Sequence, residues 1–244
     1  MKKHIPNFIT LLNLASGIIA VLFATQNQLE YAAFFIVAGI IFDFFDGFVA
    51  RILHVQSELG VQLDSLADMV TSGIAPGIIM FQLLRNADSD WSMTDYLSNV
   101  NDIDYLPFFG IIISLAAAYR LATFNIDEEQ HDSFIGLPTP ALTLLILSLP
   151  LISKYGTYTW INELVENKMF LIFIVIIGSI LMNSRLPLFS LKFKNFSLKE
   201  NIIKFTFLGL SALLLGLFQI TAIPFIIILY VVLSIVENML NKSN

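Results

Sequence analysis

Long apolar runs separated by short polar segments dominate the sequence. A helix needs about 20 predominantly apolar residues to cross the hydrocarbon core of a bilayer. Eight runs approach or reach that length, with limits near 6–25, 31–53, 60–84, 105–125, 138–154, 168–184, 202–219 and 221–239. The fifth run is the shortest, and little chain separates the last two. The pattern therefore predicts an all-α, polytopic transmembrane bundle of six to eight spans, in a single domain covering residues 1–244.

The composition supports a membrane protein. Of 244 residues, 57% are hydrophobic and 13% are charged, whereas a soluble domain has about 25% charged residues. The net charge of −6 leaves no basic surface for nucleic acid. The chain has no cysteine, which excludes disulfides and thiolate metal sites. The basic start and first apolar run resemble a signal peptide, but no small-residue cleavage site follows, so we expect a retained first helix.

The basic residues predict an orientation, because cytoplasmic loops carry an excess of Lys and Arg. With the N-terminus in the cytoplasm, that side holds Lys2, Lys3, Arg51, Arg120, Arg185, Lys192, Lys194, Lys199, Lys204 and Lys242. The opposite side holds only Arg85, Lys154 and Lys168. We therefore expect a cytoplasmic N-terminus, with the acidic segment 86–104 outside. The basic segment 185–204 is either an interfacial helix or a plain loop.

Four aspartates, Asp43, Asp46, Asp64 and Asp68, lie in the second and third apolar runs, near the ends expected to be cytoplasmic. A carboxylate at the bilayer centre costs about 2.5 to 3.5 kcal/mol on insertion scales, and less near the interface. The members of each pair share a helix face, where like charges repel. Arg51 alone cannot balance four carboxylates. Hard divalent cations can, so the charge count predicts a site for two Mg²⁺ or Mn²⁺ ions.

Small residues adjoin the acidic pairs. Gly47 and Gly60 let a backbone or a ligand approach closely in a membrane helix. Ala50, about one turn beyond Gly47, extends a smooth groove beside the carboxylates. Arg51 is placed to hold a phosphate. A pair of metal ions beside a phosphate-binding arginine is an arrangement that catalyses phosphoryl transfer.

Two other interpretations of the acidic cluster are interhelical Asp–Arg pairing and an ion or proton transport pathway. Four acids at this spacing argue against simple pairing with one arginine. Their position at one face, instead of along the membrane normal, argues against a pathway. The last four runs also supply almost no ionisable residues to continue one.

The spacing D-x2-D-G-x2-A-R-x8-G-x3-D-x3-D, from Asp43 to Asp68, is similar to the signature of the CDP-alcohol phosphatidyltransferase family. The segment IPNFITLLNLASG, Ile5 to Gly17, also looks like the opening helix of that family. The resemblance implies a membrane enzyme that transfers a phosphatidyl group from a CDP-linked lipid to an alcohol and releases CMP. Its catalytic helices would cover about 6–154, with C-terminal helices at about 168–239.

The resemblance also implies roles for single residues. Asp43, Asp46 and Asp64 would ligate both metals, and Asp68 would ligate one metal and act as general base on the acceptor hydroxyl. The CDP-lipid would contact Pro6, Asn7, Gly47, Ala50, Arg51, Ser57 and Gly60. The family further suggests a homodimer in a bacterial-type cytoplasmic membrane, with the active site facing the cytoplasm.

Two further stretches resemble the phosphatidylserine synthase branch of this family: YRLATFN, Tyr119 to Asn125, and FIGLPTPA, Phe134 to Ala141. This resemblance implies CDP-diacylglycerol and L-serine as substrates, with Arg120 and Asn125 on the acceptor. A guanidinium is suited to bind a serine carboxylate bidentately or to hold a lipid phosphate. Thr123 stands where that branch often has a second arginine.

Other roles and other acceptors fit the same residues. Arg120 also suits a helix end that reaches toward the interface, and Asn125 and the GLPTP segment suit a helix cap and a rigid turn. Glycerol 3-phosphate, inositol phosphate and choline are the alternative acceptors. The two phosphorylated ones should require more cations near the site than Arg51 and Arg120 supply.

Overall fold

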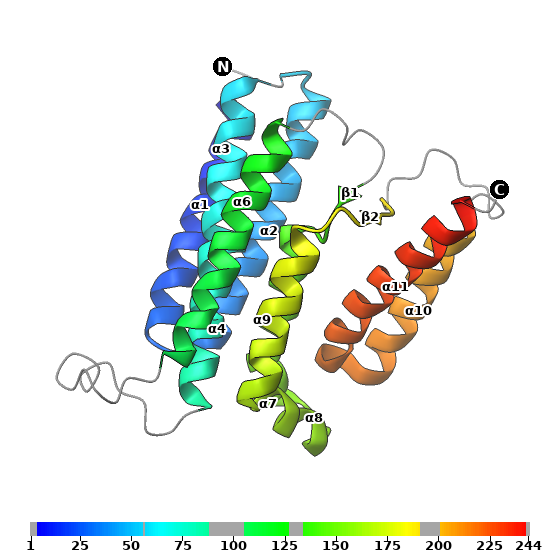
Figure 1. Ribbon diagram of the computed structural model, residues 1–244. Helices are drawn as coiled ribbons and strands as arrows, with labels where there is room; N and C mark the ends of the chain where they lie inside the picture. The colour runs from blue at the N-terminus through cyan, green and yellow to red at the C-terminus, as the bar shows by residue number, and fades with distance from the viewer. Residues whose placement is uncertain (1–3, 56, 88–104, 127–133, 191–200, 243–244) are drawn as a thin grey trace.

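The computed structural model describes residues 4–55, 57–87, 105–126, 134–190 and 201–242. Apart from turns and two short strands, these residues are helical, which confirms the all-α prediction (Figure 1). The α-helices are α1 (His4–Thr25), α2 (Leu29–Ile52), α3 (Glu58–Asp68), α4 (Ala75–Asn86), α6 (Gly110–Ile126), α7 (Thr139–Tyr155), α8 (Thr159–Val165), α9 (Lys168–Met182), α10 (Ile202–Phe218) and α11 (Ala222–Lys242). The strands are β1 (Phe134–Ile135) and β2 (Pro187–Leu188).

Each predicted apolar run corresponds to one helix or to a continuous stack of helical segments. The third run is such a stack, in which the π-helical segment Met69–Ile74 joins α3 to α4. By length and composition, five described stretches can cross a membrane, or six if the bent pair α8 and α9 is one span. One of the five, Ile202–Leu240, contains both α10 and α11, and α7 is a shorter apolar helix. The protein is therefore an integral, multi-pass membrane protein.

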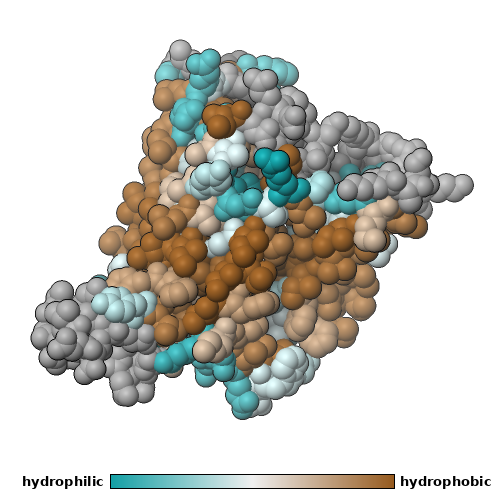
Figure 2. All heavy atoms as spheres, viewed as in Figure 1, coloured by the Kyte–Doolittle hydropathy of each residue, from teal (hydrophilic) through white to brown (hydrophobic). Residues whose placement is uncertain are grey.

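Large hydrophobic side chains are exposed on α1, α2, α6, α9, α10 and α11. Figure 2 shows hydrophobic residues in a broad band across the visible face, with hydrophilic residues gathered toward its upper and lower parts. Inside, α1 and α2 pack against each other, and each carries buried alanines, Ala20 and Ala24 on α1 and Ala32 and Ala33 on α2. The α10–α11 hairpin stands at the edge of the bundle, and α1 begins and α11 ends in the upper half of the view (Figure 1).

A short antiparallel sheet connects the hairpin to the other helices. Phe134 of β1 pairs with Leu188 of β2, and Ile135 pairs with Pro187. From α11, Tyr230 Oη donates to the Phe189 carbonyl at 2.9 Å, and Asn238 Nδ2 donates to the Pro187 carbonyl at 2.6 Å. These hydrogen bonds hold α11 against the backbone of the β2 segment.

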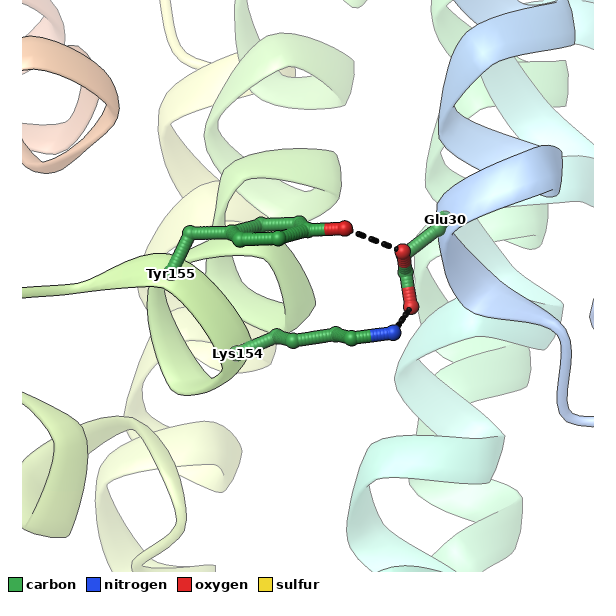
Figure 3. Close-up of polar contacts among 3 residues, drawn as sticks. All are labelled: Glu30, Lys154 and Tyr155. Carbon is green, nitrogen blue, oxygen red and sulfur yellow. Dashed lines mark hydrogen bonds and ion pairs between the residues drawn. The ribbon is translucent and has the colours of Figure 1, made fainter.

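Polar contacts connect the N-terminal end of α2 to the C-terminal end of α7. Glu30, at the start of α2, accepts hydrogen bonds from Lys154 Nζ and, at 2.6 Å, from Tyr155 Oη at the end of α7 (Figure 3). Glu30 and Asp43 are separated by about 20 Å of helix, at 1.5 Å per residue. The tie therefore fixes the bundle at a distance from the acidic cluster.

The predicted loops fall largely outside the described residues. Most of the acidic segment 86–104 and the middle of the basic segment 185–204 lie there. Helix α8 was not predicted, because its seven residues are far shorter than a span.

Candidate active site

Three of the four aspartates meet where the last turns of α2 face α3. Carboxylate oxygens of Asp43, Asp64 and Asp68 all lie within 4.8 Å of one another. Asp64 and Asp68 are four residues apart and therefore share the face of α3 that points to α2. None of these carboxylates forms an ion pair with a Lys or Arg among the residues that the structure describes. Interhelical Asp–Arg pairing thus does not account for the cluster.

Asp46 lies apart from this trio. Its side chain is buried, with 6% of its surface exposed, and it borders a neighbouring cavity that Asp64 also lines. Within the described chain, Asp46 Oδ2 and Asp64 Oδ1 are buried without a hydrogen-bond partner. A buried charged oxygen is costly unless it is paired or coordinates a metal. The donor set, made only of carboxylate oxygens, fits a hard divalent cation such as Mg²⁺ or Mn²⁺.

Asn13 of α1 reaches the same cluster, although no sequence motif marked it. Asn13 Nδ2 donates to Asp68 Oδ1 at 3.2 Å, and Thr71 Oγ1 donates to Asn13 Oδ1 at 2.8 Å. Both Asn13 and Thr71 are fully buried. A single asparagine in an apolar run forms no pattern, so only the fold reveals this contact.

The cavity beside Asp46 lies between α1, α2 and the start of α3. It has a volume of about 500 Å³ and is lined by Pro6, Asn7, Thr10, Asp46, Gly47, Ala50, Val55, Ser57, Glu58, Gly60, Val61 and Asp64. Every predicted CDP-lipid contact except Arg51 is in this set. Thr10, Val55, Glu58 and Val61 are lining residues that the motif did not identify. Such a volume is typical of small-molecule sites, which range over about 300 to 1,000 Å³.

Local structure explains why small residues line this cavity. Ser57 caps α3, and its Oγ accepts a hydrogen bond from Gly60 N at 3.1 Å. A Cβ on Gly60 would lie 3.2 Å from Ser57 Oγ and 3.4 Å from Asn7 Oδ1, so any side chain there would crowd the wall. The N-terminus of α3, with its exposed backbone N–H groups, also favours an anion at this point.

Arg51 lies beside the cavity instead of lining it. Its Nε donates to the Gly47 carbonyl at 3.0 Å, so the exposed guanidinium group bends back along α2. A Cβ on Gly47 would have only Arg51 Nη2 within 4 Å. The surface between these two residues is therefore open to a ligand.

The two predicted acceptor residues occupy different settings. Arg120 is buried, and its Nε and Nη2 donate to the carbonyls of Leu137 at 2.7 Å and Gly136 at 3.3 Å. Gly136 has φ +75°, a conformation that suits glycine, and the arginine thus holds the GLPTP turn. Asn125 exchanges hydrogen bonds with Ser65, which lies beside Asp64 on α3. Asn125 therefore contacts α3, the acidic helix that carries Asp64 and Asp68, whereas Arg120 donates its hydrogen bonds to backbone carbonyls.

Comparison with known proteins agrees with this arrangement. A family model described as CDP-alcohol phosphatidyltransferase matches residues 3–188. The CDP-diacylglycerol–serine O-phosphatidyltransferase of Bacillus subtilis is 33% identical over 164 residues, 64% of this chain and 82% of that protein. Proteins with the same name from Helicobacter pylori strain 26695 and Saccharomyces cerevisiae are 31% and 34% identical, over 84% and 63% of this chain and 80% and 55% of their own lengths. The match to the family model ends at β2 and leaves α10 and α11 outside it.

Proposed function

The chain belongs to the CDP-alcohol phosphatidyltransferase family, and we propose that it transfers the phosphatidyl group of CDP-diacylglycerol to L-serine. The products are phosphatidylserine and CMP. Bacterial and yeast relatives carry the name of this activity. The observation that carries the proposal is the cluster of carboxylates that form no ion pair with a described Lys or Arg, beside a cavity between the first three helices.

We propose that divalent cations, two by charge count, bind at this cluster as Mg²⁺ or Mn²⁺. Asp43, Asp64 and Asp68 would supply the central ligands, and Asp46 would contribute from the cavity side. The two unpartnered oxygens, on Asp46 and Asp64, support this assignment. When bound, such ions neutralise phosphate charge and stabilise the leaving CMP.

The cavity would take the CDP part of the lipid. Gly47, Ala50 and Gly60 form walls without long side chains, and the amide of Asn7 offers hydrogen bonds. The diphosphate then has Asp46 and Asp64 on one side and the N-terminus of α3 on the other. Arg51 donates to the carbonyl of Gly47, which lines the cavity, so its guanidinium group would contact a phosphate bound beside that glycine.

Asp68 would act as general base. It takes the proton of the serine hydroxyl as that oxygen bonds to the lipid-side phosphorus, while the bond from this phosphorus to the CMP oxygen breaks. A hydroxyl needs such a positioned base, because its own pKa is high. Asn125, beside the acidic helix, would contact the acceptor. Arg120 would act on the acceptor indirectly, by holding the GLPTP turn. Its hydrogen bonds to backbone carbonyls favour this role over direct contact with the serine carboxylate.

We further propose that the site faces the cytoplasm and that the protein is a homodimer. The basic residues support the orientation, because most of them lie on the side that holds the acidic ends of α2 and α3. The homodimer rests on the resemblance to the family.

The test is purified protein in detergent with CDP-diacylglycerol and a panel of labelled alcohols: L-serine, glycerol 3-phosphate, inositol phosphate and choline. We expect CMP release and labelled lipid with serine only, and neither with Asp68→Asn. Turnover with another alcohol would change the acceptor but keep the chemistry. A transporter would release no CMP with any of them.

A further inference from the structure

Asn13 and Thr71 form a buried hydrogen-bonded link that ends on Asp68. Thr71 Oγ1 donates to Asn13 Oδ1 at 2.8 Å, and Asn13 Nδ2 donates to Asp68 Oδ1 at 3.2 Å. Neither Asn13 nor Thr71 has exposed surface. Buried polar side chains are costly unless they are hydrogen-bonded. Here the Thr71 hydroxyl of the π-helical segment bonds to the Asn13 amide of α1, and that amide bonds to the Asp68 carboxylate.

The link has a fixed direction. A carboxylate only accepts hydrogen bonds, so the amide of Asn13 must present its NH₂ group to Asp68. The Thr71 hydroxyl has one proton. Its nearer acceptor is the side-chain oxygen Asn13 Oδ1, at 2.8 Å, because the backbone carbonyl oxygen of Asn13 lies at 3.3 Å. Thr71 therefore holds the amide in the orientation that Asp68 requires. With the amide turned over, two oxygens would face each other.

The surrounding helices make room for this link. A Cβ on Gly17 of α1 would lie 2.4 Å from Thr71 Oγ1. A Cβ on Gly39 of α2 would lie 2.6 Å from Thr71 Cγ2 and 2.9 Å from Asn13 Oδ1. Glycines on two different helices thus fit around the same pair of side chains.

The backbone contributes a second, independent feature. The π-helical segment Met69–Ile74 starts directly after Asp68, and the backbone N–H of Ala75 bonds to the Val70 carbonyl, five residues back. A π-type turn rotates the following residues relative to an α-helix, and such turns are frequent at functional sites. Thr71 lies in this turn, on the side that meets Asn13.

We propose that Asn13 and Thr71 are positioning residues for Asp68 in the transfer reaction, an inference that rests on the proposed function. Asn13 fixes the plane of the Asp68 carboxylate through Oδ1, so that the other oxygen is presented to the cluster. Thr71 acts one step further away, by holding the amide of Asn13. Neither residue lines the cavity, so the link should affect turnover more than substrate binding.

Two substitutions of Thr71 separate this role from packing. Thr71→Val keeps the shape and both methyl-sized branches but removes the hydroxyl, whereas Thr71→Ser keeps the hydroxyl and removes the methyl beside Gly39. We expect Thr71→Val to lower kcat by about 10- to 100-fold, the usual range for partners that orient a metal ligand. The KM for CDP-diacylglycerol should stay within about twofold, and Thr71→Ser should keep near wild-type kcat. A packing role predicts the reverse order, and that order would overturn the proposal.

A double-mutant cycle tests whether the two residues act in series. Asn13→Ala should also lower kcat by about 10- to 100-fold. Adding Thr71→Val to Asn13→Ala should then cost no further activity, because the hydroxyl has no amide left to orient. Additive losses would show two independent effects. If Asn13→Ala does not fold, the comparison of Thr71→Val with Thr71→Ser decides alone.

Binding of Mn²⁺ alone provides a readout that needs no turnover. Electron paramagnetic resonance of purified protein should show Mn²⁺ affinity weakened by about 10-fold in Thr71→Val, the lower end of that range, and unchanged in Thr71→Ser. Equal affinities and equal kcat values in Thr71→Val and wild type would overturn the link and leave the proposed function standing. Wild-type protein that releases no CMP with serine would overturn the function, while the Mn²⁺ comparison would still test the link.

Discussion

Replacing Gly39 with alanine is expected to reduce both the stability and the turnover of the protein. The added Cβ would lie 2.6 Å from Thr71 Cγ2 and 2.9 Å from Asn13 Oδ1. Carbon atoms prefer separations of about 3.5 to 4.0 Å, so α1, α2 or the π-helical segment must move apart by roughly 1 Å. Overpacking of this kind typically costs about 1 to 3 kcal/mol.

Both consequences have a measurable size. A loss of 1 kcal/mol lowers Tm by about 2 to 4 °C for chains of 150 to 250 residues, so we expect a decrease of about 2 to 12 °C for Gly39→Ala. A misplacement of about 1 Å near a catalytic group can lower the rate by about 100-fold. We therefore expect kcat to fall by 10-fold or more, again on the order of the loss from disturbing an orienting partner. The assays are thermal unfolding in detergent and CMP release at saturating CDP-diacylglycerol and serine.

Gly216→Ala is the matched control. A Cβ on Gly216, in α10, would meet nothing within 4 Å. This substitution should leave kcat unchanged and should not lower Tm, because alanine favours a helix over glycine. If Gly39→Ala lowers Tm but keeps wild-type kcat, the close packing around Thr71 does not control Asp68. If it changes neither quantity, the close approach of the three segments is wrong.

Four further outcomes are expected. Asp68→Asn should lower turnover by at least about 100-fold, the scale of general base catalysis, and should still bind CDP-diacylglycerol; wild-type activity would remove the base role. EDTA should silence the enzyme and Mg²⁺ or Mn²⁺ restore it, whereas full activity in chelator would exclude the metal site. Glu30→Gln should lower Tm without changing kcat, because this tie lies about 20 Å along α2 from the cluster; a changed kcat would contradict that separation. In this cysteine-free chain, a thiol reagent applied to the outside of intact cells should label Thr157→Cys and not His54→Cys, and the opposite pattern would invert the orientation.

The spans could be predicted from the sequence because the length of an apolar run sets the length of the helix. The π-helical segment Met69–Ile74 inside the third run could not, since its residues, MVTSGI, form no pattern that distinguishes a π-type turn from an α-helix. The grouping of Asp64 and Asp68 followed from their spacing of four residues. Asp43 and Asp46 are three residues apart and point about 60° from each other on a helix of 3.6 residues per turn. This difference places one in the trio and the other at the cavity.

Contacts between distant segments were beyond sequence reasoning. Asn13 meets residues that follow it by 55 and 58 positions, and no local pattern connects them. For Arg120 the sequence predicted a contact with the acceptor or a helix end near the interface, whereas its hydrogen bonds go to the backbone carbonyls of Gly136 and Leu137. Six of the seven residues expected to contact the CDP-lipid line the cavity, while the contact itself stays a prediction.

The hydrogen bonds between α11 and the β2 segment make the C-terminal hairpin a mechanical part of the enzyme. Tyr230 and Asn238 bind backbone carbonyls on both sides of Leu188, the residue that pairs with Phe134 of β1. Sliding α11 along its axis would therefore pull on β2, then on β1, and then on the turn that Arg120 holds. The hydrogen bonds from the Tyr230 and Asn238 side chains are directional, so a shift of α11 would be passed to the β2 backbone that accepts them. Although the hairpin lies outside the residues matched by the family model, its position is therefore tied to that of the GLPTP turn.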